Sequence, residues 1–287
     1  MGKSRLEFNN PNTQARLRKE GRGYGTGEGY QSWLQTRDVA SKGKSTRLKG
    51  WRTGDRIVNV LSNLELALFF NLEWDPKVSD YRDQFPLEME GLANTQEIAD
   101  MLGYKHPQGR DKKTKTLQPI PMSTDFLVTH HDGSEVAYAV KPAVEVNLED
   151  TDRPRHVERN WEKLEIEKKY FALRRIDWEL VTENQINFIL ARNVETVHQE
   201  WWTDSLYPYT EADVERVNEF LFSLVCSETH PLKEIARECD DALKLEPGAA
   251  QQMAHHLIAR RRWPVDFSVP YELGGILRLQ KAEVASC

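Results

Sequence analysis

Residues 122–142, MSTDFLVTHHDGSEVAYAVKP, constrain the fold of this chain more than any other segment. Two runs rich in apolar residues flank a turn that contains Asp-Gly, which is typical of a β-hairpin. Each run also carries one charge within its pattern, Asp125 in the first and Lys141 in the second. Because opposed side chains of paired strands share one face of a sheet, the loop length decides whether the two charges meet.

Two loop lengths give two registers for this hairpin. A two-residue loop over 132–133 sends Lys141 to the face opposite Asp125. A three-residue loop over 131–133, with its glycine in the left-handed region, sets Asp125 opposite Ala139 and diagonal to Lys141 on one face. We predict the three-residue loop, because it gathers all but one of the large apolar residues on the other face.

An Asp and a Lys on one strand face have two interpretations. They form a structural ion pair, or they belong to the PD-(D/E)xK pattern of the restriction-endonuclease-like fold, in which an Asp is followed by a Lys on the adjacent strand. In that chemistry the carboxylate holds Mg²⁺, the cation acidifies a water, and the lysine orients the water or stabilises the developing charge. Taken alone, the pattern is weakly specific.

The same fold places an acidic residue on an early helix beside the sheet. Glu65, in SNLELALFF, is the candidate. Ser62 stands three residues before it, and this spacing is also that of a capping box, in which the glutamate bonds back to the N-cap amide. The residues leave both interpretations open, and a carboxylate in the first turn can serve either purpose.

Charge is distributed unevenly along the 287 residues. The net charge is −6, yet residues 1–60 hold 13 Lys and Arg against 5 Asp and Glu. A basic arm of this kind steers a protein toward phosphates, although a solvated face is the alternative. The glycine-rich stretch 20–30, EGRGYGTGEGY, has no apolar period, so we expect a loop or arm that lies outside the packed core.

No apolar run approaches the ~18 residues of a membrane span, and the first residues lack the apolar core of a signal peptide. We therefore expect a cytoplasmic protein with no membrane partner. The three cysteines include no CxxC spacing, which favours reduced thiols over a disulfide framework.

The order of patterns predicts two domains. Over residues 45–184 strand and helix signals mix, which predicts an α/β domain, with a central mixed sheet flanked by helices, within residues 1–184. Over residues 185–287 helical patterns dominate and end in PVDFSVPY, a candidate β-wing, which predicts a mostly α winged-helix domain. The run Arg260–Arg262 either contacts DNA or complements the end of the last helix, and the pair His255-His256 is expected at the surface.

A set of motifs in order between about residues 20 and 187 resembles one family. They are EGRG, Trp33-Leu34, LSNLELALFFNLEW, DYRDQFPL, HP, MSTDFLV, AVKP and EKLEIEKKYF. Together they resemble TnsA, the endonuclease subunit of the heteromeric TnsA–TnsB bacterial transposases. This resemblance implies a Mg²⁺-dependent DNA endonuclease with a restriction-endonuclease-like fold, which cuts the non-transferred strand at the 5′ ends of the transposon. It also implies double-stranded transposon ends, a TnsB-type transposase and a TnsC-type AAA+ regulator as partners.

The resemblance also implies the site residues. By motif it places the catalytic residues at Glu65, Asp125 and Lys141, and the metal ligands at Glu65, Asp125 and the carbonyl of Val140. The sequence departs from the family pattern at Ala139, where relatives carry an acid or glutamine. We therefore expect weak Mg²⁺ affinity or a preference for Mn²⁺, with water completing the ligand set.

Two alternatives to this function stay open. Ala139 also fits a catalytically weak or inactive adaptor that bridges DNA, TnsB and TnsC, and the fold alone fits a free-standing restriction-type nuclease. For several polar residues we prefer a structural interpretation to a role in the site. These are Gln84 as a cap of the sheet edge, Glu165 and Glu167 as a charged helix face, and His130 and His131 as loop residues.

Overall fold

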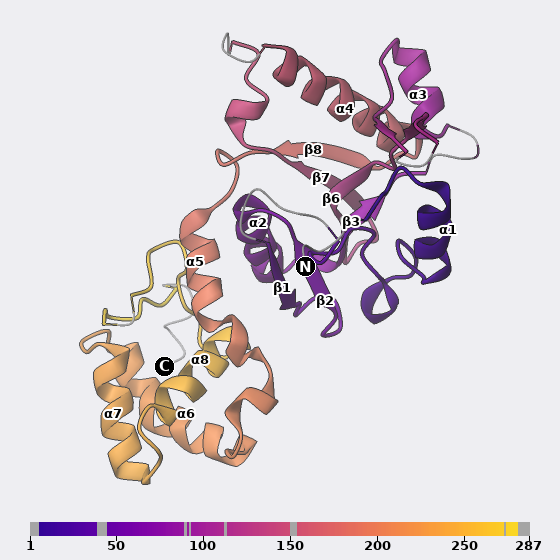
Figure 1. Cartoon of the computed structure of the whole chain (residues 1–287). Coiled ribbons are helices and arrows are strands. Elements are labelled where there is room, and N and C mark those ends of the chain that lie inside the picture. Colours follow the sequence, from indigo (N-terminus) through magenta and orange to yellow (C-terminus); the bar gives the residue numbers. More distant parts are fainter. Residues whose placement is uncertain are drawn as a thin grey trace. The chain divides into compact units, whose positions relative to one another are not determined.

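The computed structural model describes residues 6–38, 45–88, 91, 93–111, 114–149, 154–272 and 274–280. The chain divides into two compact units, Met1–Ile186 and Asn187–Cys287, which Figure 1 colours along the sequence.

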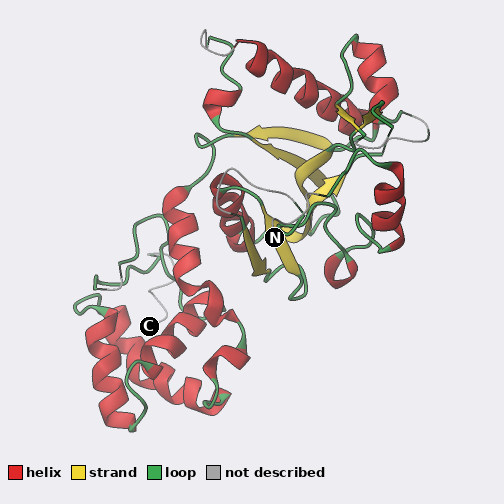
Figure 2. Cartoon of the chain, viewed as in Figure 1, coloured by secondary structure: helices red, strands yellow, loops and turns green. Residues whose placement is uncertain are grey.

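The N-terminal unit is a mixed α/β structure (Figure 2). Its helices are α1 (Pro11–Lys19), α2 (Asn63–Trp74), α3 (Thr95–Leu102) and α4 (Pro154–Leu173), with 3₁₀ turns η1 (Gly27–Gly29) and η2 (Ala143–Glu145). Its strands are β1 (Thr46–Lys49), β2 (Ile57–Val60), β3 (Val78–Pro86), β4 (Gln108–Arg110), β5 (Leu117–Pro119), β6 (Ser123–His130), β7 (Glu135–Val140) and β8 (Asp177–Val181). The main sheet has the order β3-β6-β7-β8, with β7 and β8 parallel and the other pairs antiparallel, which confirms the expected mixed sheet.

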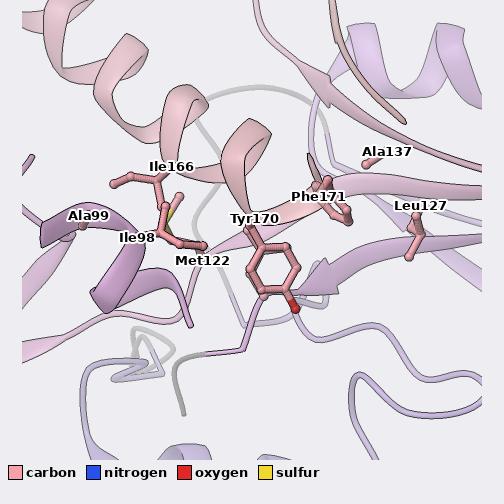
Figure 3. Close-up of a cluster of buried hydrophobic side chains, with 9 residues drawn as sticks. Ile98, Ala99, Met122, Leu127, Ala137, Ile166, Tyr170 and Phe171 are labelled. Carbon is pink, nitrogen blue, oxygen red and sulfur yellow. The ribbon is translucent and has the colours of Figure 1, made fainter. Parts of the chain in front are cut away.

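The two faces of this sheet are covered by different helices. On one face, Phe69 of α2 packs edge-on against Tyr81 of β3, which packs in turn against Phe126 of β6. The next residue, Leu127, points to the opposite face because side chains alternate along a strand. There it joins a buried cluster with residues of α3 and α4, including Ile98, Ile166, Tyr170 and Phe171 (Figure 3). The sheet is therefore a central layer between helices.

The hairpin of β6 and β7 has the register of the three-residue loop. Phe126 lies opposite Tyr138, and Val128 lies opposite Val136. Gly133 closes the loop with a φ of +82°, as that loop requires. The predicted register is confirmed. It places Asp125 and Lys141 on the same face as Leu127.

The first hairpin and the following helix also agree with the sequence pattern. β1 and β2 pair antiparallel, with Thr46 opposite Val60. Ser62 caps α2 by accepting a hydrogen bond from the Glu65 amide at 3.1 Å. At the other end of α2, the buried Glu73 carboxylate accepts hydrogen bonds from the Trp51 amide and the Tyr81 hydroxyl, so the hairpin, the helix and the sheet are held together.

The polar, basic stretch between α3 and β6 contains a small sheet. Within it, β4 and β5 form a two-stranded antiparallel sheet with Gln108 opposite Pro119. Each strand has only three residues, too few for an alternation of apolar residues to be recognised in the sequence.

The prediction of a loose glycine-rich arm at the N-terminus is wrong. Residues 11–19 form α1, and three large side chains before residue 34 are almost fully buried: Leu17, Tyr30 and Trp33. The Arg22 guanidinium forms a buried ion pair with Asp38. The segment lacks an apolar period because a few widely spaced residues, rather than a continuous face, attach it to the domain.

The C-terminal unit is helical. It contains α5 (Phe188–Val197), α6 (Glu211–Cys226), α7 (Leu232–Leu243) and α8 (Ala249–Ala259), with 3₁₀ turns η3 (His198–Trp201) and η4 (Thr203–Leu206). After α8 the described residues form one isolated β-bridge, Val265 with Leu279, so the winged-helix prediction is not confirmed. In the described part of the chain, no helix is both long and apolar enough to cross a membrane.

One expectation about α8 needs correction. His255 and His256 are buried rather than at the surface. The His255 ring is hydrogen-bonded to the Tyr271 hydroxyl at 2.9 Å, and burial lowers its pKa to about 4. Arg262 pairs with Glu211 and Glu215 within the same unit, and Arg260 lies over the ring of Trp201.

Candidate active site

The register of β6 and β7 brings Asp125 and Lys141 together. The Lys141 ammonium lies 3.3 Å from the Asp125 carboxylate, which also accepts the Val140 amide hydrogen at 2.7 Å. The ammonium donates a second hydrogen bond to the Val140 carbonyl at 2.8 Å. Lys141 itself is tied to β8, because its amide donates to the Val181 carbonyl. Both side chains are therefore placed by sheet hydrogen bonding and not by a flexible loop.

Glu65 lies in the first turn of α2, where its carboxylate is held by two hydrogen bonds. One carboxylate oxygen, Oε2, accepts the Leu61 amide hydrogen at 2.8 Å, one residue before the helix cap. The same oxygen accepts a hydrogen bond from the Gln84 side chain at 3.1 Å. Glu65 is 6% exposed, so this first-turn carboxylate faces the sheet rather than solvent. Its carboxylate therefore bonds to the residue before the N-cap Ser62, in place of the predicted bond to the N-cap amide, and belongs to the cluster around Asp125.

Gln84 links the two carboxylates. Its amide nitrogen lies 3.1 Å from Glu65 and 3.5 Å from Asp125. The residue is 2% exposed and has a φ of +49°, in the left-handed region that a non-glycine residue adopts at a cost of about 1–3 kcal/mol. Although β3 is an edge strand, the interpretation of Gln84 as an edge cap is wrong, because its side chain is turned into the site.

The charges in the cluster depend on one another. Burial, and then the nearby Asp125 carboxylate, raise the pKa of Glu65 well above its usual range. Burial alone would lower the pKa of Lys141, but the carboxylates of Asp125, Glu167 and Glu65 outweigh it and raise the pKa. The carboxylates therefore keep the lysine protonated, while burial and the neighbouring Asp125 disfavour the charged form of Glu65.

Glu167 of α4 is a further member of this cluster. It is 6% exposed, its carboxylate accepts a hydrogen bond from the Trp178 indole at 3.1 Å, and burial raises its pKa to about 7. The interpretation of this residue as part of a solvated helix face is wrong. A signal was available, since Glu167 follows Leu164 by three positions and precedes Phe171 by four, which places it on the apolar stripe. Glu165, by contrast, is half-buried.

The oxygen atoms at the site fit a hard cation that takes few of its ligands from the protein. Glu65 and Asp125 supply carboxylate oxygens, and the Val140 carbonyl is beside them but already accepts the Lys141 ammonium. Ala139 is buried and offers no side-chain ligand. Among the residues that the structure describes, no group of three or more His, Cys, Asp or Glu is arranged to hold a metal ion. Such a donor set suits Mg²⁺, which keeps several waters and takes one or two carboxylates.

The remaining sequence candidates lie elsewhere. His130 and His131 are at the tip of the hairpin, where the His130 ring is hydrogen-bonded to the Ser134 hydroxyl, so they are loop residues as expected. They take no part in the cluster of Glu65, Asp125 and Lys141.

Fold and site together define an α/β domain in which a buried glutamate, an aspartate and a lysine meet at a mixed sheet. A family model described as "TnsA-like endonuclease N terminal" matches residues 75–183, and one described as "TnsA endonuclease C terminal" matches residues 185–267. The chain is 39% identical over 202 residues to the transposon Tn7 transposition protein TnsA of Escherichia coli. This chain belongs to the TnsA family.

The match to the E. coli protein covers only part of each chain. The aligned region covers 69% of this chain and 66% of the E. coli protein. Asp125 and Lys141 lie inside the first family match, whereas Glu65 lies before its first residue.

Proposed function

We propose that this chain is a Mg²⁺-dependent DNA endonuclease subunit of a cut-and-paste transposase. It hydrolyses the non-transferred strand at the 5′ ends of the transposon, in a complex with a TnsB-type transposase and a TnsC-type AAA+ regulator. Membership of the TnsA family supports the transposition setting.

One observation carries the proposal. The Lys141 ammonium lies 3.3 Å from Asp125, and the Gln84 amide connects Asp125 to the buried Glu65. A structural ion pair alone would not need a second, buried carboxylate held beside the first at an energetic cost.

Each residue has a chemical role in this proposal. Glu65 and Asp125 hold the cation, and Gln84 fixes the two carboxylates relative to each other. When bound, Mg²⁺ acidifies a water and neutralises charge on the scissile phosphate. Lys141, kept protonated by the surrounding carboxylates, stabilises the negative charge that develops on the phosphate oxygens. Because few protein ligands are available, we expect weak Mg²⁺ binding in the absence of DNA and efficient substitution by Mn²⁺.

Strand-specific mapping of donor-DNA cleavage, in a reaction with the TnsB-type and TnsC-type partners and Mg²⁺, tests the proposal. We expect wild type to cut the 5′ strands, and Asp125→Ala to leave only the 3′ nicks. We expect Lys141→Ala to lower 5′ cleavage by ~10²–10³-fold, because charge stabilisation at the transition state is removed. Lys168→Ala, on the exposed side of α4, is the matched control and should cut like wild type.

A second candidate function is an adaptor with a weak or inactive site, which the missing side-chain ligand at Ala139 favours. Identical strand products from wild type and Asp125→Ala would establish the adaptor and exclude the nuclease. Cleavage of DNA by the purified chain without partners would instead indicate a free-standing nuclease.

A further inference from the structure

A cavity beside the end of β3 has no role in the chemistry above. It has a volume of about 250 Å³ and is lined by the N-terminal segment, the end of β3 and Tyr170 of α4. Phe85 and Pro86 line it and directly follow Gln84 in the chain. The amide of Trp33, another lining residue, donates a hydrogen bond to the Gln84 carbonyl at 3.2 Å, so the cavity adjoins the backbone of the residue whose side chain touches both carboxylates.

Aromatic rings form much of the lining. Tyr24, Trp33, Phe85 and Tyr170 all contribute to it. Tyr24 is 54% exposed, which is high for a large aromatic residue, whereas Trp33 is 1% exposed. An exposed aromatic side chain such as Tyr24 is the kind of surface on which unpaired bases stack in proteins that bind single strands.

Two residues that line the cavity each carry a buried nitrogen without a hydrogen-bond partner. The indole nitrogen of Trp33 and Nε of Arg82 are buried and have no hydrogen-bond partner. Both residues line the cavity. A buried donor without a partner is costly, and such groups in native proteins usually have an acceptor in a ligand or a bound water. A flat group with ring nitrogens or carbonyl oxygens supplies those acceptors.

The charge of the cavity favours a base over a free phosphate. Of its arginines, Arg22 is neutralised by Asp38, and the Arg82 guanidinium pairs with Glu135. Arg18 remains, with a hydrogen bond to the Tyr24 hydroxyl at 3.1 Å and a position 5.9 Å from the Trp33 ring. One arginine over aromatic rings is suited to stack on a base, whereas an isolated phosphate site would present several uncompensated cations.

We propose that this cavity, bounded by Arg18, Tyr24, Trp33 and Phe85, binds an unpaired nucleobase of the DNA strand beside the scissile phosphate. The inference rests on the proposed function, because it takes the substrate to be DNA cut at the Glu65–Asp125 site. Holding one base out of the helix would fix which phosphate lies at the carboxylates.

The test uses the full chain and single-stranded oligonucleotides of the transposon-end sequence, without metal and with EDTA. A fluorescent base analogue, 2-aminopurine, is placed at successive positions around the cleavage point, and its quenching is titrated. We expect strong quenching at one position only. Tyr24→Ala and Arg18→Ala should weaken that titration by ~5–150-fold, the usual range for loss of one stacking contact. Arg16→Ala, exposed on the same helix and outside the cavity, should stay within about twofold of wild type.

Quenching that does not depend on position would overturn the proposal, as would equal losses in Arg16→Ala and Arg18→Ala. If the cavity variants bind the oligonucleotides like wild type but no longer associate with the TnsB-type partner, the cavity holds a protein segment instead. Asp125→Asn separates the two levels of inference. This variant should quench the 2-aminopurine fluorescence as strongly as wild type does. If it still cuts donor DNA, the proposed function is wrong, and the base site is then judged by the quenching titration alone.

Discussion

At the residue scale, Gln84 explains how two carboxylates coexist in a buried site. Its amide nitrogen is within 3.5 Å of both Glu65 and Asp125, and its backbone adopts a φ of +49° to bring the side chain there. Backbone strain of this kind persists where the surrounding structure fixes it, and it is common at functional sites. The amide offers both carboxylates a shared donor without adding a charge.

Removing this donor should weaken the site without unfolding it. We expect Gln84→Leu to lower strand cleavage ~10–100-fold, the usual effect of losing a partner that orients metal ligands, and to raise the Mg²⁺ concentration needed for half-maximal rate. Gln84→Asn keeps the amide and should retain part of the activity. Gln31→Leu, at an exposed glutamine, is the control. Unchanged Mg²⁺ dependence in Gln84→Leu would show that Gln84 does not orient the carboxylates.

At the scale of elements, one loop sets the geometry of the site. Gly133 ends the three-residue loop with a φ of +82°, and this loop places Asp125 and Lys141 on one face. Nothing lies within 4 Å of a Cβ built on Gly133, so a side chain there meets no steric conflict with other residues. Any loss of stability on substitution of Gly133 therefore comes from its backbone conformation.

We expect Gly133→Ala to lower the free energy of unfolding by about 1–2 kcal/mol, because an L-residue is disfavoured in the left-handed region. Gly133→Asn should cost less, since asparagine tolerates that conformation. Gly29 also has open space around it but no positive φ, so Gly29→Ala is a matched control with little expected effect. Urea unfolding of the full chain measures all three. Equal stability of Gly133→Ala and Gly29→Ala would contradict the importance of the loop conformation.

At the scale of the whole molecule, the C-terminal unit contains a buried titratable group that makes its stability depend on pH. Burial lowers the pKa of His255 from 6.5 to about 4. The unfolded chain therefore binds a proton at this histidine below about pH 6.5, while the folded chain resists it until about pH 4. The associated stability is fully present above pH 6.5 and is lost as the pH falls toward 4.

Between pH 7 and pH 5 this loss amounts to about 2 kcal/mol. We expect His255→Gln, which cannot take up a proton, to lose less free energy of unfolding than wild type over this interval. His230→Gln, at an exposed histidine, should follow the wild-type dependence. Urea unfolding of each variant at both pH values gives the comparison, and equal slopes for wild type and His255→Gln would rule out the buried histidine as the cause.

Local patterns predicted much of this fold. Alternation of apolar residues and the length of one loop gave the β6–β7 register, and Ser62 with the apolar period after it gave α2. The same patterns failed for the N-terminal segment and for His255. Tyr30 and Trp33 are isolated in sequence and become buried only against a sheet formed later in the chain, and helical spacing alone does not reveal how many sides of α8 are covered.

The sequence by itself determined the α2 helix and the pairing of Asp125 with Lys141, because each depends on residues within one helix or one hairpin. Tertiary structure alone decided that Glu65 reaches Gln84, that Glu167 is buried beside the lysine, and that a base-sized cavity opens next to them. Those contacts join segments far apart in the chain. Their energies depend on burial and on neighbouring charges, which no local pattern of residues specifies.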